Sequence, residues 1–107
     1  MRPTFRVANL EEAISFYVDL FGFRVDVVLQ AGALLRAGSA ELELVLGQVS
    51  DPAHAYLYVS GVDELHDRAV AAGHRIASEL TNRPWGLRDF VLVDPFGNRV
   101  SVGEWIS

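Results

Sequence analysis

The chain has 107 residues, which is enough for one small domain but too few for two halves that are each stable alone. Half of the residues are apolar and 21% are charged, so the chain can bury a core and does not belong to the disordered class. The formal net charge of −5 and the scattered positions of the arginines exclude nucleic acid as a partner, because phosphate binding depends on clustered Lys and Arg.

The sequence also lacks cysteine, so it offers no disulfide framework, no thiolate nucleophile and no cysteine-based zinc site. Its apolar runs are of strand length, and its N-terminus lacks a signal-peptide pattern. We therefore predict a soluble cytoplasmic protein that does not contact a membrane. The acidic balance is compatible with a cationic small ligand.

The first half of the chain predicts one strand, one helix and three further strands. A strand over residues 3–8 leads to Asn9, a good helix N-cap, and Glu12 completes a capping box. Apolar residues then recur at helical spacing over about 10–20, and Gly22 is placed for a left-handed C-cap. Three strands follow, separated by short turns that contain glycine, over 23–29, 31–37 and 41–47.

After a linker over residues 48–53, the second half repeats this order in outline. The predicted elements are a strand, a helix and three strands, over 54–60, 62–72, 74–78, 87–93 and 99–104. Residues 79–86 are predicted to be a loop. Residues 94–98 are predicted to be a tight hairpin turn shaped by Pro95 and Gly97.

The order βαβββ therefore occurs twice, which predicts an α+β fold of two modules, over about residues 1–48 and 54–107. The two modules are expected to share one sheet system within a single domain. The space between two such modules is the expected place for a small ligand.

Two pairs of segments carry a family resemblance: Asn9–Tyr17 with Leu20–Phe23, and Pro84–Phe90 with Asp94–Asn98. They resemble the motifs of the vicinal-oxygen-chelate superfamily, which contains glyoxalase I, extradiol dioxygenases, and fosfomycin and bleomycin resistance proteins. The Trp85-Gly86 pair and residues 58–65 are most similar to the bleomycin-resistance branch. The resemblance covers essentially the whole chain and implies two βαβββ modules that form curved mixed sheets around a cavity.

The metalloenzymes of this superfamily bind an ion through His, Glu or Gln side chains from both modules. The resemblance puts Arg2 and Ser101 at two of these positions, and Arg cannot bind a metal at neutral pH. His54 is retained, and Glu43 falls near the remaining position. A catalytic ion typically needs at least three protein ligands, so we predict no bound metal and no other cofactor.

Aromatic and polar side chains on the expected cavity side form the predicted ligand site. His54, Tyr56 and Tyr58 share one face of their strand because side chains alternate. The resemblance turns one face of the last strand, with Ser101 and Trp105, toward the cavity. The predicted ligand-binding residues are His54, Tyr56, Tyr58, Trp85, Trp105, Glu43 and Ser101. No nucleophile with a neighbouring base is apparent, and no catalytic residue is assigned.

Four side chains have structural alternatives. Trp105 either contacts the ligand or belongs to the core or to an interface. Trp85 either caps the cavity or fills a neighbouring core, and His54 either lines the cavity or is an exposed side chain at the start of a strand. Arg6 is expected to pair with Glu41 or Glu43, which is a structural role.

The leading hypothesis is a small-molecule binding protein of the bleomycin-resistance type, which sequesters a ligand such as an antibiotic without a catalytic metal. An aromatic-lined cavity in an acidic protein would bind a flat or cationic molecule by stacking and cation–π attraction. The alternative is a metal-dependent lyase, isomerase or dioxygenase of the same superfamily, in which the ion acts as a Lewis acid. A third hypothesis is a metal-free enzyme with Glu43 or His54 as general base.

We also expect a homodimer. Each module presents a curved sheet whose open side must be covered, and 107 residues leave little material to cover both. In bleomycin-resistance-like proteins the paired modules come from different chains, so the resemblance implies two equivalent grooves in each dimer. Pairing within one chain, which gives a monomer, is the alternative.

Overall fold

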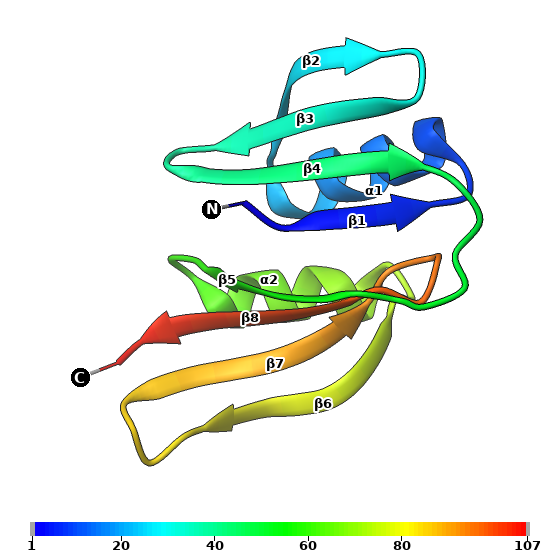
Figure 1. Cartoon of the computed structure of the whole chain (residues 1–107). Coiled ribbons are helices and arrows are strands. Elements are labelled where there is room, and N and C mark those ends of the chain that lie inside the picture. Colours follow the sequence, from blue (N-terminus) through cyan, green and yellow to red (C-terminus); the bar gives the residue numbers. More distant parts are fainter. Residues whose placement is uncertain (1, 107) are drawn as a thin grey trace. The chain divides into compact units, whose positions relative to one another are not determined.

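Ten elements of secondary structure form two four-stranded sheets, each with one helix, in a computed structural model that describes residues 2–106 (Figure 1). The first unit contains the chain up to Ala53 together with Pro95–Asn98. The second unit contains His54–Asp94 and the chain from Arg99 onward. The order βαβββ occurs in both, so the predicted α+β fold of two βαβββ modules with mixed sheets is confirmed.

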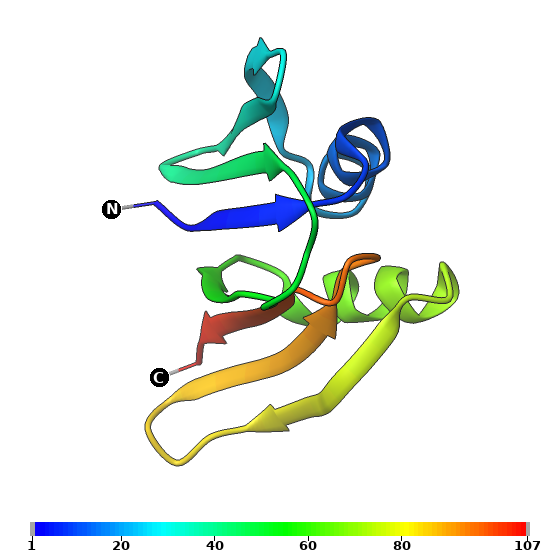
Figure 2. The same cartoon turned by 45° about the vertical axis from the view of Figure 1, so that its right-hand side comes forward.

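The first unit contains the elements β1 (Thr4–Val7), α1 (Leu10–Phe21), β2 (Arg24–Leu29), β3 (Gly32–Ala37) and β4 (Ala40–Leu46). Its sheet has the order β1-β4-β3-β2, in which β1 and β4 are parallel and the other pairs are antiparallel. Figure 2 shows α1 on one side of this sheet. The buried side chains of α1 pack there against the apolar faces of β1 and β4.

The second unit contains β5 (His54–Tyr58), α2 (Val62–Ala71), β6 (Arg75–Asn82), β7 (Leu87–Val93) and β8 (Arg99–Trp105). Its sheet has the order β5-β8-β7-β6, with β5 and β8 parallel. The other two pairs are antiparallel. The second sheet therefore repeats the topology of the first.

The helix α1 has the ends that its sequence predicts. The Asn9 side chain accepts the N–H of Glu12 at 2.9 Å, and Gly22 adopts a φ of 77°. Between these ends Phe16 and Tyr17 are buried, and their rings pack edge to face with centroids 4.8 Å apart. Local capping and an apolar stripe are thus both present, which is why this helix was predictable.

The helix α2 is capped by a residue that is distant in sequence. Its N-cap, Gly61, has no side chain to accept a hydrogen bond. The carboxylate of Glu104 on β8 instead accepts the N–H groups of Gly61 and Val62, both at 3.0 Å. These two backbone hydrogen bonds lower the pKa of Glu104, because they favour its ionised form.

The loop predicted over 79–86 is wrong in its first half. β6 continues to Asn82, and Thr81 and Asn82 lie opposite Asp89 and Arg88 of β7. β6 is an edge strand with two register shifts, and its side chains are exposed or half-buried. An edge strand of this kind needs no apolar alternation, so its polar residues resembled a loop.

The hairpin turn between β7 and β8 forms as predicted, and its residues Pro95–Asn98 belong to the first unit. Gly97 has a φ of 89°, which favours glycine. Asn98 is 1% exposed. Its side chain accepts the Ala53 N–H at 2.9 Å and donates to the Arg6 carbonyl at 3.0 Å. The turn therefore joins the linker to β1.

Within residues 2–106, neither helix is long and apolar enough to cross a membrane.

We predict that Glu104→Gln lowers the melting temperature at neutral pH, because an amide is a weaker acceptor for the N-terminus of α2 than a carboxylate. The folded-state pKa of Glu104 is depressed, so its contribution is present above the unfolded pKa. That contribution is lost as the pH falls through the folded pKa. Thermal unfolding from pH 7 downward should show the difference from wild type shrinking in acid.

Glu64→Gln is the matched control for this prediction. Glu64 lies in the first turn of the same helix, but caps no N–H group. An equal loss of melting temperature in both variants would show that the helix dipole, and not the two hydrogen bonds, accounts for the effect.

Candidate functional site

The two faces of the second sheet have different side chains. Leu57, Phe90 and Val102 are buried on the face that packs against α2, because side chains alternate along each strand. We call the opposite side the helix-free face. It carries, from β5, β7 and β8, the residues His54, Tyr56, Tyr58, Leu87, Asp89, Val91, Arg99, Ser101, Gly103 and Trp105.

The parallel register of β5 and β8 brings His54 and Ser101 together. The His54 Nε2 and Ser101 Oγ atoms are 2.7 Å apart, although the residues are 47 positions apart in the sequence. Ser101 is 6% exposed, whereas His54 is exposed. The sequence alone showed no nucleophile with a neighbouring base, but the fold places the Ser101 hydroxyl beside an imidazole nitrogen of His54. The pair fixes the orientation of the ring.

A second hydrogen-bonded chain crosses three elements. The Tyr56 hydroxyl donates to Asp89 Oδ2 at 2.8 Å, and Arg83 Nε donates to Asp89 Oδ1 at 2.8 Å. Partial burial, the hydrogen bond to Asp89 and the charge of that carboxylate raise the pKa of Tyr56. Tyr56 is therefore a neutral phenol near pH 7 and cannot serve as a phenolate base.

Gly103 makes this chain possible. A Cβ atom built on Gly103 would lie 2.9 Å from the Cε1 and Cζ atoms of Tyr56. The Tyr56 ring thus crosses β8 directly above a residue without a side chain, and so reaches Asp89 on the next strand. The sequence places Gly103 on this strand but does not reveal its role, because the role depends on a steric contact between two segments that are distant in sequence.

Three aromatic rings follow one another along the helix-free face. The rings of Tyr56 and Tyr58 have centroids 4.8 Å apart, and those of Tyr58 and Trp105 are 6.0 Å apart and only 3° from parallel. Tyr58 is 58% exposed and Trp105 is 59% exposed. Tyr58 and Trp105 therefore present two exposed and nearly parallel rings on which another ring can stack, whereas Tyr56 is tilted by 40° to Tyr58.

Trp85 lies just before β7 and is not part of the row of rings formed by Tyr56, Tyr58 and Trp105. It is 63% exposed in the turn between β6 and β7, and it makes no ring contact with the described residues. The alternative in which Trp85 fills a neighbouring core is therefore wrong. The Ile106 N–H donates to the Gly86 carbonyl at 2.9 Å, so this turn is attached to the chain that follows Trp105.

Glu43 lies in the first unit, within a network of ion pairs. Arg2 approaches Glu41 at 3.2 Å and Glu43 at 3.4 Å, and Arg36 approaches Glu41 at 3.3 Å. The expected pairing of Arg6 with these glutamates is wrong. Arg6 lies opposite Val45 in the β1–β4 register, whereas Glu43 lies opposite Thr4 and within reach of Arg2.

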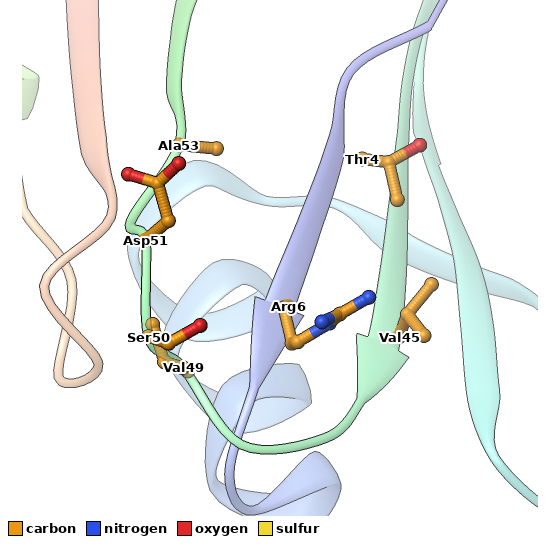
Figure 3. A pocket seen from close by; sticks show the side chains of 7 residues that line it. All are labelled: Thr4, Arg6, Val45, Val49, Ser50, Asp51 and Ala53. Carbon is orange, nitrogen blue, oxygen red and sulfur yellow. The ribbon is translucent and has the colours of Figure 1, made fainter.

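The first unit also contains a hollow of about 310 Å³ between β1 and the linker (Figure 3). It is lined by Thr4, Arg6, Val45, Val49, Ser50, Asp51 and Ala53. Figure 3 shows the Arg6 side chain extending toward Val45, while the Asp51 carboxylate points away from Arg6. The opposite charges therefore do not converge on one point.

The residues that the sequence resemblance puts at metal positions do not have the chemistry to hold a catalytic ion. Arg2 is a cation engaged by two glutamates, and Ser101 supplies a hydroxyl that already binds His54. The nearby carboxylate, Asp89, is occupied by Tyr56 and Arg83. Among residues 2–106, no three His, Asp or Glu side chains are grouped closely enough to hold a metal.

Two βαβββ modules with mixed sheets define a protein of the glyoxalase-like fold class. The chain belongs to the Glyoxalase/Bleomycin resistance protein/Dioxygenase superfamily, whose family model matches residues 2–102. The predicted superfamily is thus confirmed.

Solved structures show the same fold. Lactoylglutathione lyase from Agrobacterium tumefaciens superposes with a TM-score of 0.84 at 23% identity, over 97% of this chain and 92% of that chain. TioX from Micromonospora sp. ML1 gives a TM-score of 0.84 at 23% identity, over 97% of both chains. At this identity the likeness concerns the fold.

A curated relative matches half of the sequence. An uncharacterized protein of Mycobacterium bovis is 38% identical over 53 residues, which are 50% of this chain and 35% of that protein. The match thus spans about a third of that relative's length.

We predict that Gly103→Ala destabilises the protein by about 1–3 kcal/mol, because the new methyl group overlaps the Tyr56 ring and forces it away from Asp89. Urea unfolding monitored by circular dichroism measures the loss. In a Tyr56→Ala background the same substitution should cost clearly less, because the overlapping ring is absent. Equal costs in both backgrounds would contradict the steric role of Gly103.

Proposed function

We propose that this protein binds a small planar aromatic molecule on the helix-free face and sequesters it without a catalytic metal, in the manner of bleomycin resistance proteins. The observation that carries the proposal is the exposed, nearly parallel pair of Tyr58 and Trp105. Adjacent large rings in water are unfavourable unless they serve an interaction. Stacking of a flat ligand on them would bury both rings.

The neighbouring polar groups support binding rather than a reaction. Tyr56 holds its proton, and both oxygens of Asp89 accept hydrogen bonds from the protein. These hydrogen bonds hold Tyr56, Asp89 and Arg83 in fixed positions, and polar groups held in this way are suited to orienting a ligand. An antibiotic is one class of flat ligand that the description of the superfamily suggests.

A second candidate function is a metal-free enzyme with His54 as general base. The observation that favours it is the 2.7 Å contact between His54 Nε2 and Ser101 Oγ, on an imidazole that is exposed to a ligand. A metal-dependent lyase, isomerase or dioxygenase has less support. The resemblance puts Arg2 and Ser101 at positions where metalloenzymes of the superfamily carry ligands, and Arg2 pairs with Glu43 while Ser101 lies against His54.

We also propose that the protein is a homodimer. All six residues of β2 are exposed, and β2 is an edge strand of the first sheet. Val28 is 60% exposed and Leu29 is 66% exposed. An exposed apolar edge strand has unpaired backbone N–H and C=O groups and tends to pair with a strand of another chain. A second copy of this chain is the simplest partner that would do so.

Replacing Trp105 by Ala should weaken binding of a planar aromatic ligand by about 1–3 kcal/mol, a typical loss for an aromatic anchor. Native mass spectrometry of the full chain against flat aromatic compounds identifies a ligand, and calorimetry gives its affinity for each variant. Val70→Ala is the control, because it truncates an exposed apolar side chain of α2, which lies outside the helix-free face.

His54→Ala should cost less than Trp105→Ala if the ring only lines the site. Normal binding in Trp105→Ala, together with lost binding in His54→Ala and about one Zn, Fe, Ni or Mn per chain by elemental analysis, would contradict the proposal. The metal-dependent alternative would then be favoured.

Light scattering at micromolar concentration should give twice the 11.8 kDa mass of one chain. Leu29→Glu should shift the protein toward the monomer, because a carboxylate on the edge strand opposes apolar pairing. Val70→Glu, which changes an exposed valine of α2 in the same way, should leave the mass unchanged. A wild-type mass near one chain would contradict the dimer.

A further inference from the structure

We infer that the helix-free face selects an aromatic ligand with an acidic group, such as a carboxylate, and that Arg83 is the residue that selects it. The inference rests on the proposed function, since it assigns the ligand class of the same aromatic site. Two charged groups at this face, Asp89 and Arg83, differ in the atoms that they can still offer to a ligand.

Both oxygens of the carboxylate on this face already accept a hydrogen bond from the protein. Asp89 Oδ2 accepts the Tyr56 hydroxyl and Oδ1 accepts Arg83 Nε, each at 2.8 Å. Asp89 is itself only 6% exposed. Both hydrogen bonds are charge-assisted, and the guanidinium of Arg83 offsets the charge of this nearly buried carboxylate. Asp89 therefore offers little attraction to a cationic ligand.

Arg83 still has donors to offer. Its Nε atom is bound to Asp89, but its two terminal nitrogens have no hydrogen-bond or ion-pair partner among the described residues. The side chain is 30% exposed. Asp89 fixes the guanidinium at one corner, so the remaining N–H groups form an oriented fork. A fork of this kind matches a planar carboxylate.

The register places this fork beside the stacked rings. Asp89 lies opposite Gly103, and Trp105 is two residues further along the same face of β8. Two residues along a strand span about 7 Å, which is close to the length of a fused ring system. A ligand stacked on Trp105 can thus place an acidic substituent near Arg83. The neutral phenol of Tyr56 lies between them without an opposing charge.

Three probes that share one ring system and differ in charge test the inference. They are the anion 2-naphthoate, the neutral 2-naphthamide and the cation 2-naphthylmethylammonium. Calorimetry with the full chain should show 2-naphthoate binding about tenfold more tightly than 2-naphthamide, as expected for one charge-assisted contact. The ammonium probe should bind most weakly. Arg83→Gln should abolish the preference for the carboxylate, while Arg83→Lys, which keeps the charge, should retain part of it.

Arg99→Gln is the matched control. It removes the same charge from the same face, six residues from Trp105 along β8, and should preserve the preference for 2-naphthoate. A preference that survives Arg83→Gln in a protein with a wild-type circular dichroism spectrum overturns the role of Arg83. Equal binding of the carboxylate and amide probes overturns the acidic ligand class but leaves the aromatic site intact. Failure of all three probes to bind overturns the aromatic site, and with it the proposed function.

Discussion

The parallel pairing of β5 with β8 is the constraint on which the arrangement of the helix-free face depends. This register sets Tyr56 opposite Ser101 and Tyr58 opposite Gly103. The two strands are joined through α2, β6 and β7, so side chains more than forty residues apart become neighbours. A shift of one residue would turn every one of these side chains to the face that α2 covers.

Gly103 allows Tyr56, Asp89 and Arg83 to form one hydrogen-bonded chain across β8. Because it has no side chain, the Tyr56 ring can cross β8 and reach Asp89, and Asp89 in turn holds Arg83. Partial burial and the hydrogen bond to Asp89 raise the pKa of Tyr56 further above neutrality. The missing side chain of Gly103 therefore determines where the polar groups beside the stacked rings lie. The first sheet has the same topology, but its glutamates and arginines neutralise one another instead.

The sequence predicted most of the elements because their signals are local. Asn9 and Gly22 mark the ends of α1, and Gly97 marks the last hairpin. The errors have a common cause. The second half of β6 and the partner of Arg6 both depend on which strand lies alongside, and polar edge residues carry no periodic signal of that.

The candidate site was likewise predictable from the sequence only in part. Alternation along β5 was enough to predict that His54, Tyr56 and Tyr58 share a face, and the repeated order of elements was enough to predict the fold. Only the tertiary structure joined Ser101 to His54, laid Tyr56 across β8 and gave α2 its cap from Glu104. The physical reason is that propensity and periodicity act over a few neighbouring residues, whereas these contacts are set by the pairing of distant strands, which the local sequence does not encode.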